Sequence, residues 1–452
     1  MKKLALVVSA VLVAAVAAPA LAQDLQISGS MESNLTWRQQ QWMKDQAPDP
    51  DNPAGVSAAT TLKLNAVMGS PERGVRAFLQ LAPLEARMPF APGPGLWQIS
   101  VERAFVEANG KLWEGGPNTT ARLGSLDVGL SPYIATFDRE GLSISGLGYG
   151  PVSVSAFVGR DAAALEKDAA GNVTKYGDPF TVSGAQVRAE LLGAAGSVTA
   201  VNVNGRHDWE IGASGMPMPW INVSGTYARS GEGERPAAMT RLDAEAAVMP
   251  NLTLNAEYRN VEPGFDPAYQ KAEYDPADET TRIDWLANNK DERGVVVGVH
   301  TVQQGVDLKA SLDHYYKANV FNRDASVAAS TTLDGFELAA SGDFRLNEGV
   351  ALQKSTVSVA YPMAVTGMTV TPKYEATIEP AGISHELSAE ATVNAVPQLP
   401  GIGVAARVKR AADSSLSYGA DVSYTAPNGL STGIHYDTAK GAWAEAGLKA
   451  EF

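Results

Sequence analysis

The acidic residues of one long connector are the first candidates for chemistry in this chain. Clustered carboxylates could bind Ca²⁺, which takes roughly six to eight oxygen ligands. The connector spans residues 261–292 and carries Glu262, Asp266, Glu273, Asp275, Asp278, Glu279, Asp284, Asp291 and Glu292. The spacing lacks the Asp-x-Asp-x-Asp-Gly order of a calcium loop, so we interpret this segment as a solvated acidic loop. The same interpretation applies to Asp45, Asp49 and Asp51.

Enzyme chemistry finds little support in the residue types. There is no cysteine, so disulfides, thiolate metal sites and cysteine nucleophiles are excluded. No Gly-x-Ser-x-Gly elbow precedes a helix. The histidines lack metal-ligand spacing; they are His207, His300, His314, His385 and His435. We expect no enzyme, no cofactor and no metal, although a membrane-embedded hydrolase with Ser or Asp beside His on adjacent strands stays open.

Most other charged residues alternate with apolar ones. In residues 242–248, Leu242 and Ala244 point to one side and Asp243 and Glu245 to the other. This is the period of a β-strand that separates two different media. The same split recurs in residues 185–191, 252–259, 306–312, 336–346, 385–393 and 416–424. Helical spacing is sustained nowhere after the N-terminus.

Two kinds of connector separate these segments. Tight turns rich in proline and glycine include residues 70–74, 193–196, 216–219, 249–251, 303–305, 334–335, 361–367, 396–401 and 427–429. Longer connectors include residues 40–57, 87–96, 128–138, 161–178 and 261–292. Short turns on one rim and long loops on the other are typical of an outer-membrane barrel. The pattern predicts about 24 strands, within a range of roughly 20 to 26, and both termini on the short-turn rim.

The N-terminus has the features of a secretory signal. Lys2 and Lys3 precede an apolar core over residues 4–16, and Ala20-Leu21-Ala22 forms a small-residue cleavage site. We expect a signal peptide over residues 1–22, cleaved after Ala22 or Gln23, and a single domain over residues 24–452. No later stretch offers the ~20 apolar residues of a membrane-spanning helix. The net charge of −14 at pH 7 argues against a nucleic-acid partner.

Aromatic residues mark the expected strand ends. Trp37, Trp97, Trp209, Trp220 and Trp443 lie near predicted ends, as an aromatic girdle at the membrane interface requires. A soluble barrel or sandwich with tryptophans at its rims would show the same placement.

The last eight residues resemble the C-terminal assembly signal of bacterial outer-membrane β-barrels, although a soluble edge strand could imitate it. Its candidate residues are Glu445, Gly447 and Phe452. This resemblance implies the barrel-assembly machinery and periplasmic chaperones as partners. Residues 103–110 (RAFVEANG) and 121–133 (ARLGSLDVGLSPY) are similar to a strand–turn–strand unit of porins.

The porin resemblance implies a channel for small hydrophilic solutes in the cell outer membrane, often as a homo-oligomer. The large strand number leaves trimerisation open. In general porins the third external loop folds inward, and by position this is residues 128–138. We therefore take Asp138, Arg139 and Glu140 as constriction-loop candidates, with an ordinary surface loop as the alternative.

In such a barrel the polar phase of each strand faces the lumen. Arginine or lysine costs about 2–4 kcal/mol at the bilayer midplane but little against water. The pore-lining candidates are Arg122, Arg188, Glu190, Asp243, Glu245, Glu257, Arg259, Asp307, Lys309, Asp343, Arg345, Lys373, Glu375, Glu386, Glu390, Arg407 and Lys409. In the simpler interpretation these residues only solvate the wall and pair with one another.

The sequence therefore predicts an all-β, antiparallel, up-and-down transmembrane barrel that contacts outer-membrane lipids. We expect a water-filled channel for passive diffusion of small hydrophilic solutes or ions. The acidic excess predicts a mild cation preference, because a carboxylate-lined pore concentrates cations. Two alternatives stay open. One is a structural barrel with an occluded lumen, and the other is a secreted soluble β-sandwich or β-helix.

Overall fold

The computed structural model describes most of the chain after the N-terminal segment. The described residues are 25–38, 55–70, 74–88, 101–111, 113–114, 116–167, 173–231, 236–267, 269, 273–275, 278–283, 285–365, 367–393, 402–426, 429–438 and 441–451. The expected signal peptide and Phe452 lie outside these residues, so the expectations for them stay predictions.

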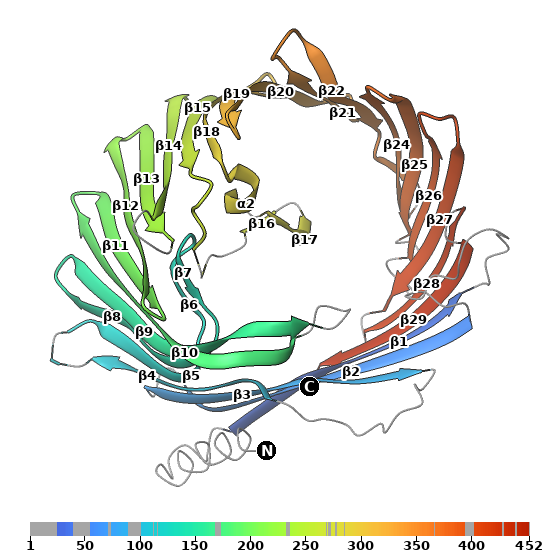
Figure 1. The fold of residues 1–452 in the computed structure, drawn as a ribbon. Coiled ribbons are helices and arrows are strands. Elements are labelled where there is room, and N and C mark those ends of the chain that lie inside the picture. Colours follow the sequence, from blue (N-terminus) through green and yellow to red (C-terminus); the bar gives the residue numbers. More distant parts are fainter. Residues whose placement is uncertain are drawn as a thin grey trace.

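The chain forms one antiparallel sheet that closes on itself (Figure 1). The first strand, β1 (Leu25–Arg38), pairs with the last, β29 (Gly441–Glu451), over nine residue pairs from Ser30–Glu451 to Arg38–Trp443. The sheet has 25 strands, but the short β23 (Met363–Val365) continues β22 (Ala351–Ala360), and both pair with β24 (Met368–Glu379). The wall is therefore a 24-strand barrel, which confirms the predicted number.

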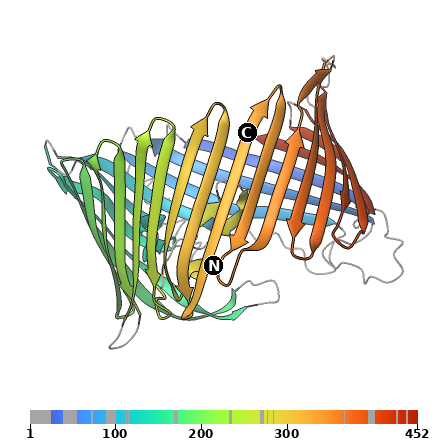
Figure 2. The same ribbon diagram turned by 90° about the horizontal axis from the view of Figure 1, so that it is seen from above.

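The other wall strands follow one another around the ring in chain order. They are β2 (Gly55–Ser70), β3 (Val75–Met88), β4 (Val101–Lys111), β5 (Asn118–Ser125), β8 (Glu140–Tyr149), β9 (Val152–Lys167), β10 (Val173–Leu191), β11 (Ala194–Val203), β12 (Arg206–Met218), β13 (Ile221–Ser230), β14 (Ala237–Met249), β15 (Leu252–Val261), β18 (Glu292–Gln303), β19 (Val306–Lys317), β20 (Val320–Leu333), β21 (Phe336–Arg345), β25 (Gly382–Val393), β26 (Ile402–Arg410), β27 (Leu416–Thr425) and β28 (Leu430–Asp437). Figure 2 shows the tilted strands running from one rim to the other.

The outer surface of this wall is apolar. Leu242, Leu387 and Ile434 are 49%, 58% and 66% exposed, and they belong to the phase opposite the charged residues. A continuous exposed apolar surface is unfavourable in water and favourable against hydrocarbon. Closure also satisfies the backbone hydrogen bonds that a lipid environment cannot. The single closed sheet excludes the sandwich and β-helix alternatives.

Both termini of the sheet lie on the same rim, here called the first rim, because β1 begins there and β29 ends there. The second rim carries the connectors that were expected to be longer. However, three of its connectors in the described wall have only two residues, at positions 204–205, 318–319 and 380–381. Asn204, Ala318 and Asn319 have φ values of 50°, 50° and 63°, which suit tight hairpin turns. The contrast between the rims is therefore smaller than expected.

Several short elements lie inside the ring (Figure 1). Hairpin β6–β7, formed by β6 (Val128–Ser131) and β7 (Ala135–Phe137), belongs to the connector between β5 and β8. The connector between β15 and β18 contributes β16 (Glu273–Asp275), β17 (Asp278–Ile283) and the five-residue helix α2 (Trp285–Asn289). No helix among the described residues is long and apolar enough to cross a membrane.

Candidate functional site: the inner wall

The inner face of the barrel is the face on which hairpin β6–β7 packs. Ile134 and Phe137 of this connector are fully buried, in one apolar cluster with Phe157 of β9, Val182 of β10 and Val261 of β15. The cluster also includes residues of β11, β13 and β14. The connector thus lies folded into the barrel and packed against its wall, and is not an ordinary surface loop.

The strand register then places every pore-lining candidate on this inner face. Arg122 pairs with Ser143, which pairs with Phe157, so these three residues share a face. Residues that are paired in register on neighbouring strands share a face, and following these pairs around the wall places the other candidates on the inner face. They are Arg188, Glu190, Asp243, Glu245, Glu257, Arg259, Asp307, Lys309, Asp343, Arg345, Lys373, Glu375, Glu386, Glu390, Arg407 and Lys409.

Several of these residues join in an ion-pair network across β14, β15, β18 and β19. Arg259 lies 2.5 Å from Glu292 and 2.6 Å from Asp313. Arg241 lies 2.9 Å from Glu257 and 3.1 Å from Asp243. The side chains of Arg259 and Glu292 are only 5% and 6% exposed. Removal of one partner of such a buried pair strongly destabilises the fold, because the other charge is then left uncompensated.

The sequence interpretation missed two members of this network. Arg241 falls in the polar phase that contains Asp243, one residue before the segment considered, so the alternation could have identified it. Glu292 was assigned to a solvated acidic loop, and this is wrong. It is the first residue of β18 and is buried against Arg259. Among the described residues, no group of three or more acidic or histidine side chains is placed to hold a metal ion.

Glycines in the wall make room for the aromatic rings of this cluster. The Phe137 and Phe157 rings stack with their centroids 4.9 Å apart. A Cβ atom at Gly159 would overlap the Phe137 ring, and one at Gly184 would overlap the Phe157 ring. These inner-face positions therefore need glycine for close packing rather than for backbone freedom.

Polar contacts attach the hairpin to the wall as well. The Ser131 hydroxyl donates a hydrogen bond to the Glu210 carboxylate of β12. The Arg241 guanidinium donates to the Tyr133 hydroxyl at 3.0 Å and lies 4.8 Å from the Trp285 ring centroid of α2. Because Arg241 also pairs with Glu257, the hairpin and the ion-pair network form one continuous structure.

The two inward connectors also contact each other. The backbone N–H of Thr136 donates to the carbonyl of Tyr269 at 3.3 Å, and the Tyr269 hydroxyl donates to Asp161 at 2.7 Å. Burial, and then the hydrogen bond to the Asp161 carboxylate, raises the pKa of the Tyr269 phenol. β16 and β17 lie nearer the middle of the ring (Figure 1). We call the packed parts, residues 126–139, 262–267, 269 and 285–291, the internal body. It packs against β9–β15.

The three constriction-loop candidates lie at the base of the hairpin. Asp138 and Arg139 are 2.9 Å apart, and Arg139 is 3.5 Å from Asp161 of β9. Glu140 is the first residue of β8. The residues that join the internal body to the far strands of its wall sector are instead Ser131 and Tyr133.

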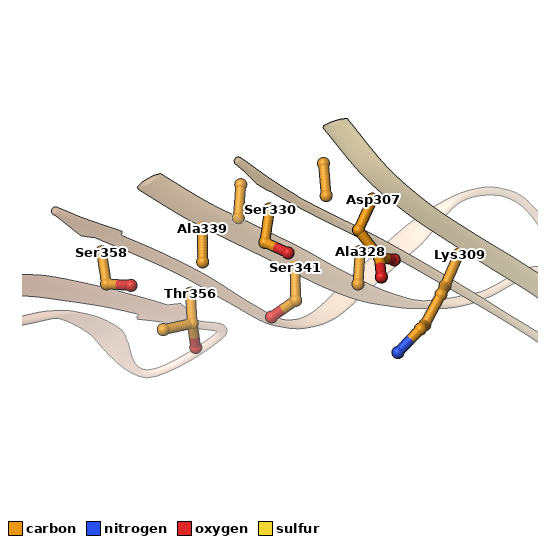
Figure 3. Close-up of a pocket in the computed structure, with 10 residues that line it drawn as sticks. Asp307, Lys309, Ala328, Ser330, Ala339, Ser341, Thr356 and Ser358 are labelled. Carbon is orange, nitrogen blue, oxygen red and sulfur yellow. The ribbon is translucent and has the colours of Figure 1, made fainter. Parts of the chain in front are cut away.

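Another sector of the inner wall is free of the described internal elements. Figure 1 shows none of them against β21 to β27. A pocket on this side spans β19 to β22 and is lined by charged, hydroxyl and alanine side chains (Figure 3). Its polar lining comprises Asp307, Lys309, Ser330, Ser341, Thr356 and Ser358.

The C-terminal strand places its two described candidates, Glu445 and Gly447, on the inner face too. Glu445 lies 3.4 Å from His435, which lies 2.7 Å from Asp421. Gly447 pairs with Ser431 in register. Trp443 stacks on the His435 ring with centroids 4.9 Å apart, so it faces the lumen. Its assignment to a lipid-facing girdle was wrong, because its register phase is that of Glu445.

Comparisons with known proteins include a solved structure that matches the fold with a TM-score above 0.5. No family model and no curated protein matches the chain. An E. coli P pilus tip assembly intermediate, PapC-PapD-PapK-PapG, matches with a TM-score of 0.58 and 11% identity over 94% of this chain and 60% of that chain. The P pilus usher PapC translocation pore matches at 0.48 and 12%, over 95% of this chain and 99% of that chain. A Rhodopseudomonas blastica porin mutant matches at 0.30 and 10%, over 74% and 99%.

The closed sheet, the apolar outer surface and the charged inner face define the class of protein. It is a transmembrane β-barrel with 24 strands and an internal body packed against one sector of its wall.

Proposed function

We propose that this barrel is an outer-membrane channel through which small hydrophilic solutes and ions diffuse passively. The observation that carries this proposal is the polar inner wall of β21 to β27, against which no described internal element packs, together with the adjoining pocket that spans β19 to β22. Charged and hydroxyl groups on that wall, such as Asp307, Lys309 and Ser341, suit contact with water. Outer-membrane lipids, the assembly machinery and periplasmic chaperones would be its partners, and a homo-oligomer is compatible with it.

A mild cation preference is part of this proposal. The chain has 50 acidic and 36 basic residues, and Glu386 and Glu390 lie on the inner face of β25. Glu386 is directly opposite Glu375 on β24 and Lys409 on β26, so the cation preference rests on the acidic excess of the whole chain rather than on this part of the wall alone. A carboxylate-lined channel attracts cations and repels anions.

Single-channel recording in a planar bilayer under a salt gradient tests both parts. We expect steady conductance steps with a reversal potential on the cation side. The Glu386→Gln/Glu390→Gln variant should shift the reversal potential toward the anion side, because it removes two negative charges from the lumen. A Lys309→Gln/Lys354→Gln variant of the same wall should shift it the other way. A wild-type reversal potential at zero or on the anion side would contradict the cation preference.

An occluded structural barrel is the second candidate function. It is supported by the internal body, whose apolar cluster and hydrogen bonds hold two connectors inside the ring. Such a barrel would tether or pack the envelope and conduct little. A folded, inserted protein that gives no conductance steps in the same bilayer experiment would favour this function over the channel.

A further inference from the structure

Five arginines lie on the outward-facing phase of the wall. The register places Arg160 of β9, Arg229 of β13, Arg293 of β18, Arg323 of β20 and Arg410 of β26 opposite the inner-face phase. Four of them lie toward the ends of their strands at the second rim, and Arg160 lies in the middle of the long strand β9, level with the second-rim end of its neighbour β8. In the first-rim halves of the described strands, no charged side chain lies on the outward phase. The outer surface is therefore cationic at one rim only.

These arginines differ from those inside the barrel. Inner arginines are held by carboxylates, as in Arg122–Glu107 at 2.6 Å and Arg345–Asp324 at 2.9 Å. None of the five outward arginines forms an ion pair with a described carboxylate. Glu140 and Glu262 also lie on the outward phase at the second rim. Figure 1 shows β8, which begins with Glu140, well separated from β18 to β20, and the Glu262 carboxylate accepts a hydrogen bond from the Ala238 N–H of β14 at 2.7 Å.

The densest group, here called the outer arginine patch, spans β18, β19 and β20. The Arg293 guanidinium lies 5.6 Å from the Tyr316 ring centroid, and that of Arg323 lies 5.7 Å from the Phe321 ring centroid. Phe321 contacts His314 edge-on and Tyr316 at a tilt, with centroids 4.8 Å and 5.4 Å apart. The two arginines are separated by two strand spacings, roughly 10 Å. Both are exposed.

A similar combination recurs on β24 to β26. His385 is directly opposite Arg410 in register, and the Tyr374 hydroxyl lies 2.8 Å from His385 Nδ1. Tyr374 and His385 also lie on the outward phase. The pairing of arginine, histidine and aromatic rings near the second rim is thus repeated on a separate sector of the wall.

This chemistry matches a phosphate group at the level of lipid headgroups. Tyrosine and phenylalanine rings near a strand end mark the membrane interface, where an amphipathic ring is most stable. A guanidinium binds phosphate through two parallel hydrogen bonds and loses less hydration than an ammonium group does. Arginines in such a position, without ion-pair partners among the described carboxylates, leave room for an anion from outside the protein.

We propose that the outer arginine patch binds the phosphate-bearing headgroup of a membrane lipid in the leaflet at the second rim. Arg293 and Arg323 contact the phosphate oxygens, and Tyr316, Phe321 and His314 pack against the lipid between them. The described strands carry no charged side chain on the outward phase at the first rim, so the barrel makes no such contact with the leaflet on that side. The patch would therefore contribute to the orientation of the barrel in its membrane.

The experiment measures lipid preference on the full-length protein. The refolded barrel is placed in detergent micelles doped with either phosphatidylcholine or a lipid whose headgroup carries two phosphate monoesters. Lipid retention is measured by native mass spectrometry. The test variant is Arg293→Gln/Arg323→Gln, and the matched control is Lys309→Gln/Lys354→Gln, which removes the same charge from the inner face.

We expect the wild type and the control to retain the phosphorylated lipid in preference to phosphatidylcholine. In the test variant this preference should fall about 30-fold, because two arginine contacts near the headgroups are lost. Equal preference in the test variant and the wild type would overturn the proposal. Competition by millimolar inorganic phosphate would overturn the lipid as occupant and assign the patch to free phosphate. Channel recordings play no part in this test, so its failure is distinct from failure of the channel proposal.

Discussion

Replacing Arg259 by methionine is expected to lower the free energy of unfolding of the barrel by about 3–5 kcal/mol. The Arg259 guanidinium lies between Glu292 and Asp313 at 2.5 Å and 2.6 Å, and the Glu292 side chain is 6% exposed. Methionine fills a similar volume but leaves Asp313 without Arg259 and leaves Glu292 with Lys317 alone, 3.4 Å away. The loss can be measured by urea-induced unfolding in lipid vesicles, followed by intrinsic tryptophan fluorescence.

The matched control is Arg345→Met. Arg345 pairs with Asp324 at 2.9 Å on the same inner face, but the two side chains are 45% and 33% exposed. Water screens this pair, so its removal should cost about 0–1 kcal/mol. If both variants lose the same stability, the Arg259 network has no special role, and the inner wall around it is as hydrated as the wall at β20 and β21.

The second large effect concerns the internal body. In Phe137→Ala, the hairpin loses a fully buried ring that stacks on Phe157, and such a truncation costs about 3–5 kcal/mol. The ratio of undocked to docked hairpin should rise on the order of 10²- to 10³-fold. Chymotrypsin cleavage near Tyr133 should accelerate, and single-channel current should become larger and noisier. The barrel itself should stay folded, because the wall is held by its own backbone hydrogen bonds.

Phe344→Ala is the control for this effect, since Phe344 lies on the outward face of β21. It should leave cleavage near Tyr133 unchanged. A second variant, Gly159→Val, attacks the same contact from the wall, because a Cβ atom there would overlap the Phe137 ring. Slow cleavage in both Phe137→Ala and Gly159→Val would mean that the ring does not hold the hairpin in the barrel.

Some inner-face residues could be predicted from the sequence and others could not. Asp243, Glu257 and Arg345 lie on strands whose apolar and polar residues alternate, so their common face follows from local order alone. Arg241 followed the same rule but fell just outside the segment considered. Glu292 could not be assigned in this way. At the end of a long acidic connector it had no visible partner, and its burial depends on Arg259, a residue 33 positions earlier.

The conformation of the connectors was harder to predict from the sequence than the strands were. The tight turn at Ala318-Asn319 joins two strands at the rim where longer loops were expected, and its positive φ values carry no glycine signal. Trp443 was placed near a strand end correctly, but its side of the wall depends on the register with His435. A tryptophan side chain is stable both at the lipid headgroups and stacked on a histidine ring inside the barrel. The residue type alone therefore does not indicate which side of the wall Trp443 faces.

The sequence by itself determined the strand period, a number close to 24 strands, a polar inner face and the return of both termini to one rim. These features depend on the two-residue repeat and on counting, which are local properties of the chain. Only the tertiary structure decided that two connectors fold inward and pack together on β9–β15, and that Arg259 joins Glu292 to Asp313. It also decided which arginines remain outside at the second rim. Such contacts join residues far apart in the chain, and barrel closure brings them together.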